Sequence, residues 1–192
     1  MTYAAVNAKI RARRGAAGSS ETSDAAGELD AICCYLRKND RDFLRKFAAG
    51  FRFYENLRLL ATLDKHSRES LRRVFLTEIN LRNILKIYRL KRFYNLNGDA
   101  ILPYLAPAGS KEVLQLAQTA GIDEFMREAS TGAGAAFAGN FAQGEKMLTL
   151  AVCAAFKREY RRENLAVACG FLYESRVADG YTNEIHKHNG AY

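Results

Sequence analysis

The longest uninterrupted helical pattern in this sequence covers residues 77–96, a stretch that contains neither glycine nor proline. Apolar side chains recur there with the spacing of one face of an α-helix. They are Leu81, Ile84, Leu85, Ile87 and Tyr88. An apolar stripe of this width is typical of a helix surrounded by other helices, so we predict a buried central helix. The opposite face carries three basic residues, Arg82, Lys86 and Arg89.

Shorter helical patterns precede and follow this stretch, separated by breaks rich in Gly, Pro, Asn, Asp or Ser. The predicted helices cover residues 3–15, 29–36, 39–58, 67–96, 110–121 and 145–173, with a further short helix from Asp123. Ser67 and Ser110 are placed to cap two of them, whereas Gly50 lies inside the 39–58 helix. Nothing in the sequence shows the two-residue alternation of a β-strand. The sequence therefore predicts an all-α protein of packed helical repeats with no significant sheet.

Two segments of small residues divide the predicted helices. Residues 16–27 are small and polar without any period, which predicts a flexible loop. Residues 131–144 are rich in glycine and alanine and mark the expected boundary between two parts of the chain. We therefore predict an N-terminal helical unit over residues 1–130, a linker over residues 131–144, and a second, shorter helical unit over residues 145–192.

The chain is basic, with 29 Lys and Arg residues against 21 Asp and Glu residues and a formal charge of +8. A basic surface suits an acidic protein, a nucleic acid or an anionic membrane surface, or is simply a solvated face. No apolar run approaches the ~20 residues needed to cross a bilayer. The first residues lack the pattern of a signal peptide, so we expect a cytoplasmic location. The four cysteines form no CxxC pair and are expected to be reduced.

A short pattern in the central helix recurs near the C-terminus. Glu78 and Asn83 have counterparts in Glu159 and Asn164, each 81 residues further along, and an apolar residue follows the asparagine in both copies. A fainter fragment lies at residues 54–58, and basic residues surround both clear copies. Internal repeats of this kind predict related structural units, so we expect two related helical units.

Three segments resemble one protein family. Residues 78–96, EINLRNILKIYRLKRFYNL, resemble the repeated helix of the C subunit of archaeal and bacterial V/A-type rotary ATPases, which is called subunit d in vacuolar enzymes. Residues 3–12, YAAVNAKIRA, resemble the opening of that family, and residues 101–109, ILPYLAPAG, resemble the segment that follows its repeated helix. Family members contain three similar helical units, so two copies and a fragment indicate a short or divergent member.

The resemblance implies a non-catalytic adaptor subunit of a proton- or sodium-translocating ATPase or ATP synthase. Such an adaptor is all-helical and funnel-shaped, and it is peripheral on the cytoplasmic face of the membrane. Its partners are the central-shaft subunits and the membrane rotor ring, between which it carries torque. The family binds no nucleotide and performs no bond chemistry, so the resemblance implies no cofactor and no small-molecule substrate.

The residues themselves offer no constellation for catalysis or metal binding. The glycines of residues 132–140 lack the lysine and the preceding strand of a phosphate-binding loop. His186 and His188 have no carboxylate or thiol suitably placed to complete a metal site. His66 lies beside Asp64 and Lys65, and no catalytic nucleophile or acid is identifiable around it. We therefore predict no catalytic, cofactor or metal site.

The candidate functional residues are instead charged and amide side chains in the two copies of the pattern. The predicted protein interface comprises Arg82, Lys86, Arg89, Arg158 and Arg162. The predicted structural set comprises Glu78, Asn83, Glu159 and Asn164, whose side chains would satisfy backbone or arginine donors between repeats. The alternative is a basic helical module that binds nucleic acid or another protein, because basic and aromatic residues interleave in residues 85–94. Nucleic acid is disfavoured because Tyr88 and Phe93 are expected in the core.

Overall fold

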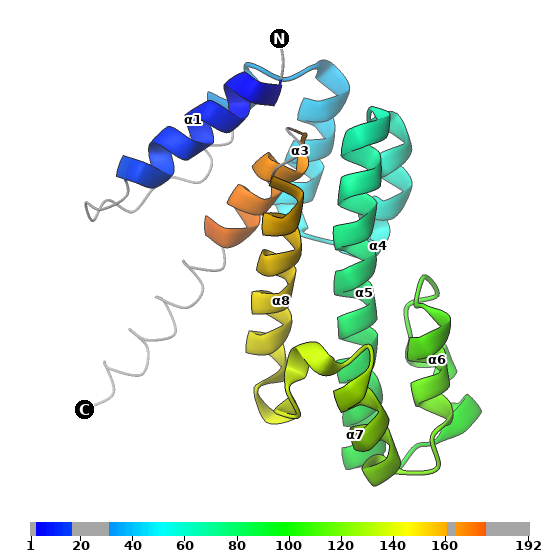
Figure 1. Cartoon of the computed structure of the whole chain (residues 1–192). Helices are drawn as coiled ribbons and strands as arrows, with labels where there is room; N and C mark the ends of the chain where they lie inside the picture. The colour runs from blue at the N-terminus through cyan, green and yellow to red at the C-terminus, as the bar shows by residue number, and fades with distance from the viewer. Residues whose placement is uncertain (1–2, 17–30, 161–163, 176–192) are drawn as a thin grey trace, which may run out of the picture. The chain divides into compact units, whose positions relative to one another are not determined.

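A computed structural model of the chain describes residues 3–16, 31–160 and 164–175 (Figure 1). The described residues form helices and turns without any β-strand, so the predicted all-α class is confirmed. The α-helices are α1 (Tyr3–Ala16), α3 (Lys38–Gly50), α4 (Phe53–Asn56), α5 (Lys65–Tyr94), α6 (Lys111–Gln118), α7 (Ile122–Thr131) and α8 (Gly144–Glu159). The 3-10 turns are η1 (Leu57–Thr62), η2 (Gly98–Ala100), η3 (Leu102–Tyr104), η4 (Ala135–Phe137) and η5 (Phe141–Gln143). Residues 31–33 and 166–175 are also helical.

Within the described ranges, no helix combines the length and the apolar character that a membrane span requires. Apart from Ala16, the loop predicted at residues 16–27 lies outside the described residues. So do Arg162 and the two histidines of the C-terminal tail, His186 and His188.

The chain divides into two compact units. Unit 1 comprises Met1–Arg72 and Phe156–Tyr192, and unit 2 comprises Arg73–Ala155. This division differs from the predicted one at residues 131–144, because that glycine- and alanine-rich segment belongs to the interior of unit 2. Its two phenylalanines, Phe137 and Phe141, are buried, and their rings stack with centroids 4.9 Å apart.

The core of unit 1 is an aromatic cluster. The ring of Phe47 on α3 lies 5.5 Å from that of Phe53 and 6.3 Å from that of Phe156, and Tyr173 contacts Phe53 at 5.7 Å. The helix predicted over residues 39–58 is interrupted, because Phe51 adopts a left-handed conformation with φ 44° and donates its N–H to the Phe47 carbonyl. Gly50 therefore ends α3 instead of lying within a longer helix.

The start of α5 also lies in unit 1, and Asp64 caps it. The Oδ1 atom of Asp64 accepts hydrogen bonds from the backbone N–H groups of His66 (3.0 Å) and Ser67 (3.1 Å). Ser67, the predicted cap, is instead buried in the first turn of the helix, and its Oγ accepts a hydrogen bond from the N–H of Leu165. The helix consequently begins at Lys65.

In unit 2, the C-terminal part of α5 lies at the centre of the core, as its apolar stripe predicted. Leu81, Ile84, Leu85 and Ile87 are at most 4% exposed. The shorter helices α6 and α7 lie beside this part of α5 (Figure 1). They supply the buried residues Val113, Leu116 and Phe125. Ser110 caps α6 as predicted, since its Oγ accepts a hydrogen bond from the N–H of Val113.

The predicted 145–173 helix is interrupted. α8 ends at Glu159, and Asn164 and Leu165 are not helical. The Oδ1 atom of Asn164 accepts a hydrogen bond from the N–H of Ala166, where the next helix starts. Glu78 and Asn83 lie within one continuous helix, whereas Glu159 is the last residue of α8 and Asn164 is not helical. The two copies of the repeated pattern therefore have different local structures.

Candidate functional site

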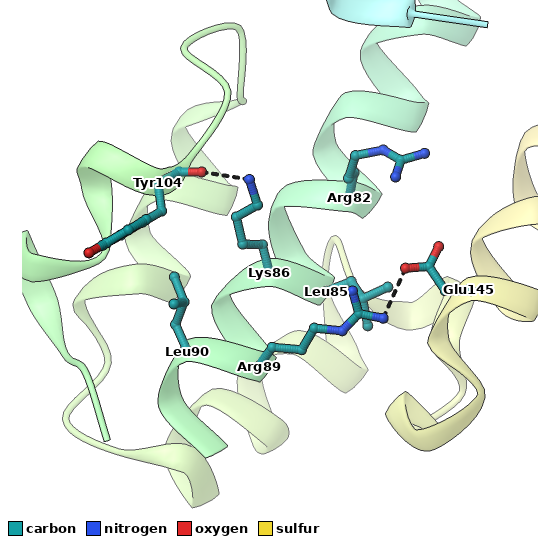
Figure 2. Close-up of a pocket in the computed structure, with 7 residues that line it drawn as sticks. All are labelled: Arg82, Leu85, Lys86, Arg89, Leu90, Tyr104 and Glu145. Atoms are coloured by element: carbon teal, nitrogen blue, oxygen red, sulfur yellow. Dashed lines mark hydrogen bonds and ion pairs between the residues drawn. The ribbon is translucent and has the colours of Figure 1, made fainter. Parts of the chain in front are cut away.

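Three basic side chains on one face of α5 form a row along unit 2. Arg82 pairs with Glu78 one turn earlier at 2.6 Å. Lys86 donates a hydrogen bond from Nζ to the carbonyl oxygen of Tyr104 at 2.9 Å. Arg89 pairs with Glu145 on α8 at 2.9 Å. Figure 2 shows Lys86 and Arg89 reaching in different directions, one toward the turn at Tyr104 and the other toward α8.

These side chains line a groove of about 390 Å³. The other lining residues are Leu85, Leu90, Tyr104 and Glu145 (Figure 2). The groove thus combines apolar surface from two leucines and a tyrosine with three cations and one carboxylate. We refer to it below as the α5 groove. A site that joins apolar surface to a few placed charges is suited to binding a ligand or a partner side chain.

Glu78 lies beneath one end of the row. Its side chain is 3% exposed, whereas that of Arg82 is 54% exposed. Burial raises the pKa of Glu78 above its usual value, and the nearby charge of Glu145 adds to this effect, although attraction to Arg82 and the hydrogen bond from it act in the opposite direction. Because Glu78 pairs with Arg82, it also offsets part of the repulsion between the like charges of Arg82 and Lys86.

Asn83, on the same helix, fastens the segment of residues 101–110 to α5. Its Nδ2 donates to the carbonyl oxygen of Ala106 at 3.0 Å, and its Oδ1 accepts from the N–H of Ala106 at 2.9 Å. Asn80 adds a third bond, in which its Oδ1 accepts from the N–H of Ser110. The segment approaches α5 closely at Gly109, where an added Cβ atom would lie 2.8 Å from Nδ2 of Asn83. A single asparagine thus satisfies both backbone groups of one residue.

The C-terminal copy of the pattern belongs to unit 1. Asn164 is 1% exposed, and its Nδ2 donates to Oγ of Ser70 at 2.8 Å. Glu159 is buried at the end of α8. Arg158 is exposed and does not line the α5 groove. Of the five predicted interface residues, the structure therefore brings together Arg82, Lys86 and Arg89.

Sequence reasoning did not select Tyr104 or Glu145. They lie 18 residues from Lys86 and 56 residues from Arg89, respectively, and no local pattern connects them to α5. Sequence reasoning also did not select Lys91, which is 4% exposed and donates to Oδ1 of Asn97 and to the carbonyl oxygen of Thr119. Burial lowers the pKa of Lys91, and the charge of Glu124 opposes that shift.

The end of α5 corrects one expectation about aromatic residues. Tyr88 stacks on Phe141 with ring centroids 4.9 Å apart. Phe93, however, was expected in the core and is 70% exposed, as is Tyr94. In the last turn of α5, Lys91 is buried against the chain that follows, whereas Arg92, Phe93 and Tyr94 are exposed, and Asn95 turns the chain with φ 51° directly after them.

A second cluster of titratable groups lies in unit 1, where α1 meets the start of α5. The hydroxyl oxygen of Tyr3 is 2.6 Å from Oδ2 of Asp64 and 3.0 Å from Oδ2 of Asp40. Burial raises the pKa of Asp40 and the charge of Asp64 adds to this rise, whereas the hydrogen bond from Tyr3 and the charge of Arg37 oppose it. Burial also raises the pKa of Tyr3.

Asp64 responds in the opposite direction. Burial alone would raise its pKa, but hydrogen bonds from Tyr3, from Ser67 and from the backbone of His66 outweigh burial and lower it. The two carboxylates around Tyr3 thus differ in proton affinity. Cys169, fully buried nearby, has a raised pKa because of burial and the charge of Asp40. It therefore lacks the exposed thiolate of a reactive cysteine.

Comparisons of the chain with protein-family models, with curated proteins and with solved structures found no match.

Proposed function

We propose that this chain is a non-catalytic adaptor in the central stalk of a V/A-type ion-translocating rotary ATPase, in a short or divergent form. The observation that carries the proposal is the hydrogen bonding between two segments that resemble this family separately. Residues 78–96 and 101–109 form one structural element, because Asn83 binds both backbone groups of Ala106 and Lys86 binds the carbonyl of Tyr104. The residues on which the resemblance depends are therefore the residues that hold this element together.

The features of unit 2 suit a protein whose task is to hold partners in a fixed orientation. Three side chains of α5, those of Asn80, Asn83 and Lys86, bond to the backbone of the segment after α5, which limits its deformation under mechanical load. The α5 groove presents charges beside apolar surface. Charges arranged in this way set the orientation and the specificity of docking more than its strength. In this proposal the partners are the shaft subunits and the rotor ring, and the chain is peripheral on the cytoplasmic face of the membrane.

Co-purification tests the proposal. The full chain would carry an affinity tag in the cells that produce it, and complexes would be isolated in a mild detergent and identified by mass spectrometry. We expect recovery of shaft and ring subunits of a rotary ATPase in stoichiometric amounts. A tagged, unrelated basic protein of similar charge is the control for ionic adsorption. Recovery of the same background proteins with the chain and with the control would overturn the proposal.

The exposed end of α5 favours one alternative function, nucleic-acid binding. Phe93 and Tyr94 are each 70% exposed beside the exposed Arg92, and bases stack on aromatic side chains in this setting. A titration with random single-stranded DNA at low and moderate salt tests this alternative. Tight binding that weakens steeply with salt, and that is lost on Phe93→Ala, would favour nucleic acid over the rotary complex.

A further inference from the structure

The two carboxylates around the α5 groove differ in how easily a partner can replace them. Glu78 is 3% exposed and is held beneath Arg82. Glu145 is 58% exposed, and its partner Arg89 is 49% exposed. An ion pair between two half-exposed groups contributes little to stability, because water solvates both charges and the long side chains lose entropy when they are held together. Glu145 can therefore leave Arg89 at low cost.

We propose that the α5 groove binds a protein segment that carries a carboxylate next to an apolar side chain, and that Glu145 occupies the place of that carboxylate in the free chain. The proposal rests on the adaptor function and names the chemistry of its partner. In the bound state, the carboxylate of the partner pairs with Arg89, and Glu145 turns into solvent from the first turn of α8.

Lys86 supplies a second point of attachment. Its ammonium group has three donors, and the hydrogen bond to the Tyr104 carbonyl uses one of them. The remaining donors lie on the exposed side of α5, one helical turn from Arg89. A second acidic side chain on the partner segment would accept hydrogen bonds from these donors of Lys86. The three cations of the groove also outnumber the carboxylate in its lining, Glu145, together with the buried partner of Arg82, Glu78, so an acidic segment complements the net charge.

The apolar lining favours a protein segment over a sugar-phosphate backbone as the occupant. Leu85, Leu90 and Tyr104 contribute apolar surface to a groove of about 390 Å³, which has room for a large side chain. A leucine or phenylalanine would remove this surface from water. A sugar-phosphate backbone offers anionic groups to Lys86 and Arg89 but no apolar group of this size for the lining.

A peptide-binding assay on the full chain tests the proposal. The probe is a fluorescein-labelled peptide of about fifteen residues in which leucines recur with the spacing of one helix face and glutamates lie next to them. Fluorescence anisotropy gives its dissociation constant. A peptide with lysine at each glutamate position is the control probe. We expect the acidic peptide to bind and the basic one to bind at least tenfold more weakly.

Three variants locate the binding site. Lys86→Glu combined with Arg89→Glu should weaken binding of the acidic peptide at least tenfold, whereas Lys111→Glu, an exposed lysine of the same unit outside the groove, should change it less than about twofold. Glu145→Gln should tighten binding about two- to fivefold, because it removes the internal competitor. Circular dichroism and thermal unfolding would confirm that each variant is folded. If the double variant reduces folding, Lys86→Gln alone should still weaken binding.

Each contrary outcome overturns a defined part of the proposal. Equal binding by the wild type and the double variant overturns the groove as the site, and unchanged binding by Glu145→Gln overturns the internal competitor. If random DNA displaces the peptide more effectively than excess acidic peptide does, the occupant is a nucleic acid instead. Recovery of rotary subunits by the double variant would overturn this inference but not the adaptor function. Peptide binding in the groove without recovery of any rotary subunit would overturn the adaptor function but not this inference.

Discussion

Replacement of Asn83 by leucine removes the reciprocal hydrogen bonds that fasten residues 101–110 to α5. Asn83 is 2% exposed, and leucine has a similar size but can neither donate to the Ala106 carbonyl nor accept from its N–H. A buried polar group that loses its partner costs about 1–3 kcal/mol. Ala106 is half-buried, so water can reach its two groups in part, and we expect a total loss of about 2–3 kcal/mol.

Thermal unfolding and amide hydrogen exchange together measure this loss. For a chain of this size, 1 kcal/mol corresponds to about 2–4 °C, so the melting temperature should fall by about 5–10 °C. The amide of Ala106 should also lose its protection from exchange, which reports on the hydrogen bond itself. Asn80→Leu is the matched control, because it removes one bond, to Ser110, instead of two and should cost about half as much.

Asn164→Leu extends the test to unit 1. Asn164 is 1% exposed and loses its bonds with the Ser70 hydroxyl and the Ala166 N–H, both of which are buried, so the cost should be at least as large. If both leucine variants melt within about 1 °C of the wild type, and Ala106 remains protected in Asn83→Leu, then the hydrogen bonds of Asn83 and Asn164 do not stabilise the units in which they lie.

Two further changes test other parts of the chain. Asp40→Asn should raise the melting temperature most at pH 7 and least near pH 4. The reason is that the pKa of Asp40 is raised in the folded chain, so the wild type loses stability as pH rises through that value; unfolding curves parallel to the wild type from pH 4 to 8 would contradict this. Gly144→Ala should lower the free energy of unfolding by about 1–3 kcal/mol, because its Cβ would overlap the buried side chain of Leu85. Gly121→Ala, whose Cβ would meet nothing within 4 Å, is the control and should leave stability nearly unchanged.

The features that could be predicted from sequence are those set by local periodicity and local hydrogen bonding. The apolar stripe of residues 77–96 correctly predicted the burial of Leu81, Ile84, Leu85 and Ile87, because a helix that lies in a core repeats its environment every 3.6 residues. Ser110 caps α6 as predicted, because a cap depends only on the residues that immediately follow it. The all-α class follows from the same regularities.

The features that sequence reasoning missed depend on contacts between distant residues. Phe137 and Phe141 lie in a glycine- and alanine-rich segment whose composition indicates a linker, yet Phe141 stacks on Tyr88 more than fifty residues away. The same limitation applies to the candidate site. The three cations could be identified from helical spacing, but the pairing of Glu145 with Arg89 depends on how α8 approaches α5. No local pattern carries that information.

The repeated pattern of glutamate and asparagine shows why a spacing that recurs within one sequence need not predict a repeated local structure. In unit 2, Asn83 lies inside a helix whose own backbone is satisfied, so its amide is available to bind Ala106. In unit 1, Asn164 lies outside a helix, and its amide caps that helix at Ala166 while it binds Ser70. The shared property is a buried amide that satisfies polar groups of another segment. A search for related helical units should therefore compare buried amide contacts before helix boundaries.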